Sequence, residues 1–514
     1  MSEVKAGAFI RPASGLRRNV TLFDATMLNV GWLTVGASIG ILGFTMALFP
    51  TVSGVNLVYA SLIGFVLVIP AVIVYTMMLP RMPRTGGDYV WMSRQLGMPL
   101  SSAIGFMLTA QIISFISIFV LSVVYTIGSV GLFFQPTSAT FLGLALPGNV
   151  PGATPLAQLI VGGAIFVVLI ILSTVAPKAS YKIISALVLI GVASTVLAMG
   201  VLLSAGNAGI VNYMSSLGNS NMTYNALASS YSGPAFNLNN TMMLMPFLFL
   251  FIYPFMNASA ISGSELKGKS AAKWSAIAGE LIALALTTGA FATMYYVAGQ
   301  AFINAAFSNP TAVFTYGINF WTLAMGAANN VALAWLLGIC WILWNLAVVM
   351  VTIIVVSRYV FAQAFDRWLP SKLAYASRWG SPLYANLLNL VVGLALVAAT
   401  VFLYGPLSSL TTLVIAPMLF FLFVGISAVL YGYKHEKGRS KATLMIAGSL
   451  MAIVFAYISV LTATLPSIYG GSTFTYSFLI VTCVIGVVLY YAYKAYYKSR
   501  GLDISLVYQQ IPPL

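Results

Sequence analysis

The sequence predicts an all-α integral membrane protein with about twelve transmembrane helices. Of its 514 residues, 60% are hydrophobic and only 6% are charged, which leaves too little polar surface to cover a soluble globule. Apolar stretches of about 20 residues recur along the chain, and each is long enough to cross a hydrocarbon core as a helix. A membrane β-barrel would instead show alternation of apolar and polar residues in segments of about 10, which is not the pattern here.

The expected spans lie at residues 23–48, 55–79, 101–133, 157–176, 182–205, 241–265, 274–300, 330–356, 383–404, 407–431, 442–465 and 474–493. They divide the chain into an amino-terminal tail (1–22), five helices (23–205), a polar loop (206–240), five more helices (241–431), two further helices (442–493) and a carboxyl-terminal tail (494–514). Because the number of spans is even, both tails are expected on the same side of the membrane.

All 23 Lys and Arg residues fall in the tails or in alternate connections, so every basic group is predicted on one side. The positive-inside rule makes that side the cytoplasm of a multi-pass cell-membrane protein, with both termini cytoplasmic. The net charge of +15 is spread over short loops rather than gathered on one folded face. Anionic lipid headgroups are therefore the expected partners of these charges, and nucleic acid is not.

Enzymatic motifs are not apparent in the sequence. The two cysteines lie inside predicted spans and the single histidine lies in a basic loop, so no metal cluster is indicated. Neither a Gly-rich phosphate loop nor a spaced Ser/His/Asp set is present. The sequence therefore predicts no catalytic residue, metal or cofactor, and favours transport over enzymatic activity. In the loop 206–240, Asn221 and Asn239 begin glycosylation-type triplets, which are common by chance in Asn-rich sequence.

A transporter needs backbone polar groups exposed at mid-membrane, and helices supply them where they are broken. The first span contains a concentration of small residues from Gly36 to Gly43, where the helix is expected to unwind. The alternative is that Gly36 and Gly40 form a close helix–helix contact, which is common in membrane bundles. Both interpretations are open at this point.

The sixth span has a second irregularity, from Phe251 to Ser259, in which Pro254 removes an amide donor and Asn257 adds a polar group. A simple kink, repaired by neighbouring groups, is the alternative to a break. Spans one and six occupy corresponding positions in two five-helix groups of opposite topology. The pair of irregularities is therefore the expected sign of an inverted repeat.

Two stretches carry a resemblance to a known family, supported by Glu265 and Lys267 after span six. Residues 82–94 contain Pro83, Gly86, Gly87 and Tyr89, a Pro-x-x-Gly-Gly-x-Tyr pattern, and residues 357–370 with Ser381-Pro382 form a helix exit and loop. Over about its first 440 residues the chain resembles the amino acid/polyamine/organocation (APC) permeases, which share the LeuT-like fold. The resemblance implies ten core helices in two inverted halves, discontinuous helices one and six, and a substrate site between the two breaks.

The resemblance and the physics together give a candidate substrate site. Amides around an unwound helix one would hold a carboxylate, and carbonyls of helix six would accept an ammonium group. An aromatic residue at Phe251 or Tyr253 would cover the substrate, and a polar residue deep in a span would line the cavity. The candidate substrate-binding residues are Gly36, Ala37, Ser38, Gly40, Gln111, Phe251, Ile252, Tyr253, Pro254, Asn257 and Asn345.

No carboxylate or Arg lies near the expected centre, which favours a neutral amino acid as substrate, carried by secondary active transport through alternating access. A polyamine or cationic amino acid exchanger, or a non-transporting sensor or scaffold with the same fold, are the alternatives. Glu280 in span seven is a candidate proton carrier, or a carboxyl paired with a basic loop residue. Proton coupling, sodium coupling and exchange are all open, as is the choice between monomer and homodimer.

Overall fold

The structure, a computed structural model, describes residues 15–47, 52–135, 141–144, 154–315, 317–402, 414–469 and 471–509. These residues form helices and irregular connections, with isolated β-bridges and no strand among them. Twelve helical segments of the described chain are long and apolar enough to cross a membrane. The predicted all-α membrane architecture is confirmed.

Ten of the twelve spans in this described part are single helices: α3 (Leu57–Arg81), α5 (Met98–Phe134), α6 (Pro155–Val175), α7 (Pro177–Ser216), α12 (Gly268–Ala298), α15 (Val331–Phe365), α16 (Leu383–Phe402), α18 (Ile415–His435), α19 (Gly438–Thr464) and α21 (Thr473–Lys498). The first and sixth spans are interrupted. The first consists of α1 (Leu22–Trp32) and α2 (Val35–Met46), and the sixth of α9 (Leu238–Met242), α10 (Met245–Phe251), η2 (Tyr253–Phe255) and α11 (Ala258–Ile261).

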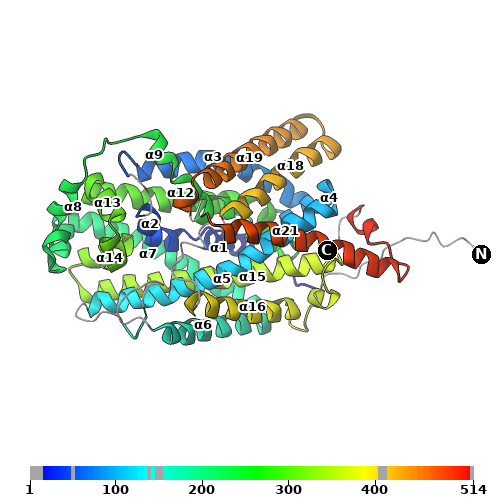
Figure 1. Ribbon diagram of the computed structural model, residues 1–514, viewed down its shortest axis with the longest axis horizontal. Helices are drawn as coiled ribbons and strands as arrows, with labels where there is room; N and C mark the ends of the chain where they lie inside the picture. The colour runs from blue at the N-terminus through cyan, green and yellow to red at the C-terminus, as the bar shows by residue number, and fades with distance from the viewer. Residues whose placement is uncertain are drawn as a thin grey trace, which may run out of the picture.

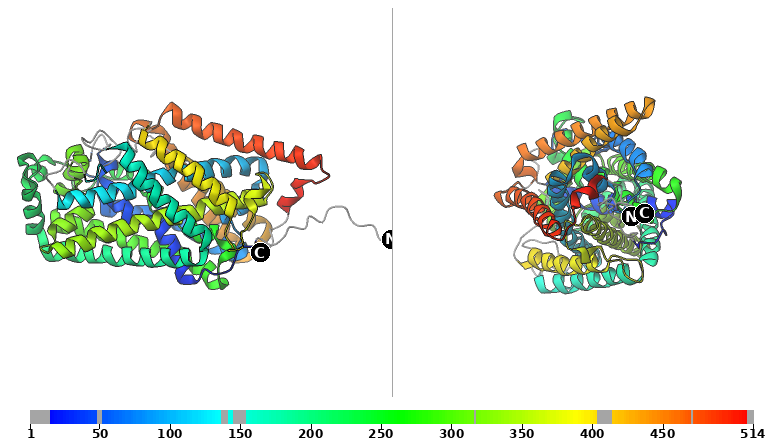
Figure 2. Two further views of the ribbon diagram at one scale, coloured as in Figure 1. Left: turned by 90° about the horizontal axis from the view of Figure 1, so that it is seen from below. Right: turned by 90° about the vertical axis from the view of Figure 1, so that its right-hand side faces the viewer.

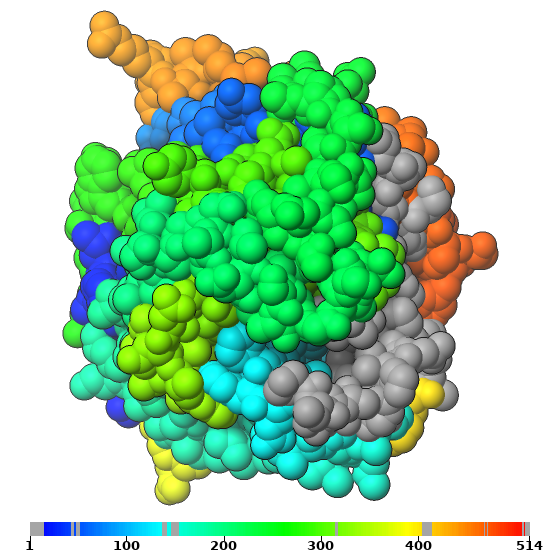
Figure 3. Space-filling view, turned by 90° about the vertical axis from the view of Figure 1, so that its left-hand side faces the viewer, coloured from blue at the N-terminus to red at the C-terminus, as the bar shows by residue number. Residues whose placement is uncertain are grey.

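The connections mark the two ends of the bundle (Figure 1). One end holds α4 (Gly87–Leu96), η3 (Gly263–Glu265), η5 (Ser371–Ala374) and the carboxyl-terminal η7 (Ile504–Gln509). We call it the basic end, because the described Lys and Arg residues lie in its connections or in the adjoining parts of the helices. At the opposite end lie α8 (Tyr224–Ser230), α13 (Gln300–Ser308) and α14 (Phe320–Ala327), and Figure 3 shows the green segments of this region covering much of that face.

The interrupted first span lies inside the bundle. Its apolar window is 94% buried within the protein, whereas those of α6 and α21 are each 28% buried and leave most of their surface for lipid. Figure 2 shows α6 and α16 together along one side of the bundle and α19 on the opposite side. The helices that carry the breaks are therefore enclosed by those that face the membrane.

Part of the loop predicted at 206–240 is helical in the structure. A non-helical Gly206, with φ +60° and ψ −166°, interrupts α7 where the loop is expected to begin, and a further helical segment then extends to Ser216. The added turns bury Ile210, Tyr213 and Met214, and α7 packs there against α14. This tertiary packing stabilises a helix that the polar composition did not predict. The start of the expected tenth span lies outside the described residues, and α18 begins at Ile415.

Candidate functional site

The first span is interrupted between Trp32 and Val35. Thr34 has φ +47°, a conformation that β-branched residues rarely adopt. The unwinding expected from Gly36 onward is therefore wrong in position. Gly36, Ala37, Ser38 and Gly40 are helical and lie in the first two turns of α2.

The glycines of α2 make close contacts with tryptophans. A Cβ atom on Gly36 would lie 2.4 Å from Cδ2 of Trp344, and one on Gly40 would lie 3.0 Å from Nε1 of Trp341. The Trp344 ring also contacts Gly191 of α7, where a Cβ atom would lie 1.9 Å from it. The small residues thus let α2 and α7 approach the indole rings of α15. This geometry supports the close-contact interpretation of Gly36 and Gly40.

Although α2 is not unwound at its glycines, its N-terminus presents free amide groups. The first intrahelical hydrogen bond runs from the Ser38 N–H to the Thr34 carbonyl, at 2.9 Å. The N–H groups of Val35, Gly36 and Ala37 come before this bond in the chain, so they have no carbonyl partner within α2. Together with the helix dipole, they make the start of α2 a favourable place for a negative charge.

The sixth span is interrupted where the sequence predicts. Helix α10 ends at Phe251, Ile252 has φ −125° and ψ −81°, Pro254 lies in η2, and α11 begins at Ala258. A break, rather than a repaired kink, is confirmed. Since spans one and six run in opposite directions, the N-terminus of α2 and the C-terminus of α10 both lie in the interior of the bundle.

The two breaks contact each other through side-chain hydroxyls. The Thr34 hydroxyl donates to the Phe251 carbonyl, and the Ser38 hydroxyl donates to the same carbonyl at 3.3 Å. Thr34 and Ser38 also contact each other at 2.9 Å. In this structure the Phe251 carbonyl, expected to accept a substrate ammonium group, is thus already hydrogen bonded. Thr34, which the sequence did not single out, is the residue that joins the breaks.

A tryptophan from outside the spans also reaches the first break. Trp321 of α14 donates its indole N–H to the Gly36 carbonyl at 2.8 Å and stacks on Trp341, with ring centroids 6.3 Å apart. Both rings are buried. The sequence did not identify Trp321, because it lies in a connection and its contact spans 285 positions of the chain.

Other predicted site residues have structural partners. The Tyr253 hydroxyl contacts Ser61 of α3 at 2.5 Å, so this ring is turned toward α3. Asn345 accepts from Ser122 of α5 at 3.0 Å and donates to the Trp341 carbonyl in its own helix. Gln111 is fully buried in α5. Asn345 therefore joins α15 to α5, which gives it a structural role in the bundle.

Asn257 belongs to a cluster on the basic-end side of the sixth-span break. Its amide donates to Asp88 at 2.7 Å, and its carbonyl accepts from the Trp32 indole at 3.0 Å. Asp88 also accepts from the hydroxyls of Tyr75 and Tyr359, at 2.6 and 2.8 Å. Burial raises the pKa of Asp88 to about 6, and the hydrogen bonds from Asn257 and the tyrosines oppose this shift.

The Gly-Gly pair of the sequence motif explains how Asp88 reaches this cluster. Gly86 and Gly87 have φ +82° and +30°, which glycine adopts most readily. A Cβ atom added to Gly86 would lie 2.4 Å from Cβ of Ala362 in α15. One added to Gly87 would lie 2.4 Å from the carbonyl oxygen of Ala260. Only glycine allows α4 to pack this closely on α11 and α15.

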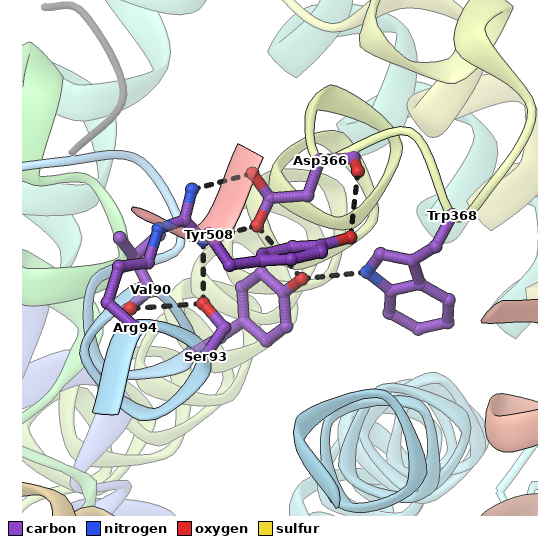
Figure 4. A network of polar contacts seen from close by, with 7 residues as sticks. Val90, Ser93, Arg94, Asp366, Trp368 and Tyr508 are labelled. Carbon is purple, nitrogen blue, oxygen red and sulfur yellow. Dashed lines mark hydrogen bonds and ion pairs between the residues drawn. The ribbon is translucent and has the colours of Figure 1, made fainter. Parts of the chain in front are cut away.

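Buried ion pairs hold the same end together. Arg358 of α15 pairs with Glu265 of η3, with 2.9 Å between Nε and Oε1, and both side chains are almost fully buried. Arg94 of α4 donates to Asp366 at 2.8 Å, and the Tyr508 hydroxyl from the carboxyl-terminal segment donates to the Asp366 carbonyl at 3.2 Å (Figure 4). Segments distant in sequence are thus joined by ion pairs and hydrogen bonds at the basic end.

Glu280 differs from the other described acidic side chains. It is 1% exposed, and neither carboxyl oxygen has a hydrogen-bond partner in the part of the chain that the structure describes. Lys273, the basic residue nearest to it in sequence, instead lies 4.7 Å from the ring of Trp274. The expected alternative, a carboxyl paired with a basic loop residue, is not what the structure shows.

Comparison with known families adds one finding. Residues 26–489 match the sequence model of a family described as amino acid permease. The match extends beyond the first 440 residues that carry the resemblance in sequence motifs, and it includes α19 and most of α21. No curated protein matches the chain.

Proposed function

Since the chain belongs to the amino acid permease family of the APC superfamily, we propose that it is a secondary active transporter of neutral amino acids that works by alternating access. Family membership makes it a transporter of amino acids or related organic cations. The finer proposal, a neutral substrate bound between the two breaks, rests on the geometry of those breaks.

The contact between the two broken helices is the observation that carries this proposal. The amides that begin α2 and the carbonyls that end α10 meet in the bundle interior, with Thr34 between them. An amino acid has a carboxylate and an ammonium group a few ångströms apart, and these helix ends offer partial charges of the matching signs. Exchange of the Thr34 and Ser38 hydroxyl bonds for bonds to substrate would open the contact between the breaks.

The composition of the breaks supports a neutral side chain. Residues 32–40 and 250–257 contain no Lys, Arg, Asp or Glu. The walls near α2 are instead the indole rings of Trp321, Trp341 and Trp344. An uncharged side chain suits such surroundings, because burial of an unpaired charge is costly.

The basic end is proposed to face the cytoplasm. The described Lys and Arg residues lie in connections and helix segments of this end, which follows the positive-inside rule. Both termini would then be cytoplasmic, and anionic headgroups of the inner leaflet would contact these residues. The opposite end, with α8, α13 and α14, would face the outside.

The test is transport by purified protein in proteoliposomes, preloaded with each member of an amino acid panel and given labelled substrate outside. We expect exchange of at least one neutral amino acid. Loss of the Thr34 hydroxyl in Thr34→Val should weaken substrate affinity by about fivefold, the effect of one lost hydrogen bond, whereas Thr34→Ser should restore it.

Thr464→Val is the matched control, because Thr464 lies at the exposed end of α19 and bonds only within its own helix. Wild-type affinity in Thr34→Val would contradict a site at the breaks. Absence of exchange for every amino acid in the panel would contradict the proposed function.

A carrier of cationic amino acids or polyamines is the second candidate. The observation that favours it is the unpaired Glu280 carboxyl, which lies on the helix that packs against α1. In that case a cationic panel member such as arginine or putrescine would be exchanged, and Glu280→Gln would abolish its binding. Exchange of neutral amino acids by Glu280→Gln would contradict this candidate.

A further inference from the structure

We propose that Glu280 is the proton-carrying group of this transporter, so that amino acid movement is coupled to protons through a carboxyl placed beside both helix breaks. The inference rests on the proposed transport function and adds the coupling ion and the residue that carries it. Its basis is the position of the carboxyl and the lack of partners around it.

Glu280 is isolated in a way that no other described acidic residue is. Asp24, Glu265, Asp366 and Glu436 each pair with a Lys or Arg. Asp88 and Asp503 accept hydrogen bonds from neighbouring groups. Glu280 is buried like Asp24, Asp88, Glu265 and Asp366, but has neither kind of partner among the described residues. An ionised carboxylate would be an uncompensated buried charge, so the structure accommodates this side chain in its neutral, protonated form.

The carboxyl lies deep in the bundle. Glu280 is 12 residues after Gly268, where α12 begins at the basic end, which corresponds to roughly 18 Å along the helix. In the structure described here, both carboxyl oxygens are buried away from solvent. Exchange of a proton with water requires a state in which the surroundings of α12 have opened.

The position of Glu280 connects it to both breaks. A Cβ atom on the preceding residue, Gly279, would lie 3.0 Å from Cβ of Asn29 and 3.8 Å from Leu33, so α12 packs there on the last turn of α1. Tyr253 of η2 lies within electrostatic range of the Glu280 carboxyl. Its hydroxyl contacts Ser61, which in turn contacts Thr288, two turns further along α12.

Several titratable groups of the helices that pack on α12 have partners elsewhere. The helix packs on α1, α3 and α7, and to a lesser extent on α2, α11 and α13, of which the last three contain no titratable side chain. Tyr253 is a titratable group within electrostatic range of Glu280. The other groups with assigned partners are Asp24 with Lys182, Tyr75 with Asp88, Arg81 with Glu436, and Tyr181 with Ser262.

These contacts give a coupling mechanism. With its proton bound, Glu280 is neutral and allows α12 to pack against α1 as observed. When the breaks open, water reaches the carboxyl, the proton leaves to water, and the resulting carboxylate disfavours closure until a proton is bound again. Closure of the two breaks and protonation of Glu280 therefore favour each other, as reciprocal linkage requires.

The test compares wild type, Glu280→Gln and the control Glu436→Gln in proteoliposomes that contain a pH-sensitive dye. In wild type and in the control, we expect external substrate to acidify the lumen and an imposed pH gradient to drive accumulation. Glu280→Gln mimics the protonated carboxyl, so it should keep substrate exchange with preloaded vesicles and lose both acidification and gradient-driven accumulation. Acidification by Glu280→Gln, or its absence in wild type that exchanges substrate, would overturn the inference.

A measurement without substrate separates this inference from the proposed function. Infrared spectra of the purified protein at neutral pH should show the carbonyl stretch of a protonated carboxylic acid, and Glu280→Gln should lack that band. A spectrum of wild type identical to that of Glu280→Gln in this region would overturn the inference, whether or not transport is observed. Failure of the whole amino acid panel in exchange would instead count against the proposed function.

Discussion

The two halves of the broken helices are held by different chemistry. On the basic-end side, α1, the start of α11 and η3 are joined to their neighbours by Asp24 with Lys182, Asn257 with Asp88, and Glu265 with Arg358. On the other side, α2 is held by close packing of its glycines on tryptophan rings and by neutral hydrogen bonds. The first side is held by charged and polar pairs, and the second by close packing of side chains. The stability of the two sides should therefore respond differently to substitution and pH.

This difference suits the alternating access proposed above, in which the two sides open in turn. Buried charge pairs resist partial separation, because each partner is costly to leave alone. Packing of glycine on indole is sensitive to a single added methyl group, but carries no dependence on protonation. Substitutions on each side therefore test whether the two sides are held as the contacts indicate.

The largest effect should come from the charged side. Arg358→Ala leaves the Glu265 carboxylate buried without its partner, and we expect it to lower the free energy of unfolding by about 3–5 kcal/mol. Thermal unfolding of the detergent-solubilised protein measures this loss. Lys269→Ala, at an exposed basic position of α12, is the control and should leave stability unchanged. Equal stability of the two variants would show that the ion pair does not hold η3 to α15.

The next effect depends on pH. Burial raises the pKa of Asp88 to about 6 from an ordinary value of 3.8, so its contribution to stability is fully present below pH 3.8 and is lost as pH rises to about 6. Over that window the loss amounts to about 3 kcal/mol.

Asp88→Asn removes this titration, so its unfolding temperature should fall less than that of wild type between pH 4 and 6, the range set by these two pKa values. Asp503→Asn, in the exposed carboxyl-terminal segment, should keep the wild-type profile. An Asp88→Asn profile parallel to that of wild type would refute the assignment.

On the packed side, Gly36→Ala should destabilise the protein by about 1–3 kcal/mol, because its Cβ atom would lie 2.4 Å from the Trp344 ring. Gly200→Ala is a matched control in α7, where an added Cβ atom meets nothing within 4 Å. The control should be neutral or slightly stabilising, since alanine favours helix. A neutral Gly36→Ala variant would mean that α2 and Trp344 are not in contact. The measurement is again thermal unfolding.

The smallest effect concerns a single neutral hydrogen bond. Trp321→Phe keeps the aromatic ring but removes the donor to the Gly36 carbonyl, and should cost about 1 kcal/mol. Trp335→Phe, at an exposed position of α15, is the control. Chemical denaturation of both variants compares them directly, and identical midpoints would contradict a structural role for the Trp321 N–H group.

Much of the fold could be predicted because membrane helices have a local signal. Length and hydropathy locate the spans, and the distribution of Lys and Arg places the connections. The break in the sixth span was also predictable, because Pro254 lacks an amide donor and Asn257 is polar. The break in the first span was placed a few residues too late, since glycines signal both unwinding and close packing. Only the positions of Trp344 and Trp341 in the folded protein show that the glycines serve close packing and not unwinding.

The sequence by itself determined the membrane class, the number of spans, the single basic end and the two irregular helices, because composition and hydrophobic length act within each segment. The tertiary structure decided which polar groups have partners, because those pairs join residues far apart in the chain. Thr34 and Phe251 are 217 positions apart, and Arg358 and Glu265 are 93 apart. The isolation of Glu280 is of the same kind, since a buried carboxyl is known to lack a partner only when the packing around it is known.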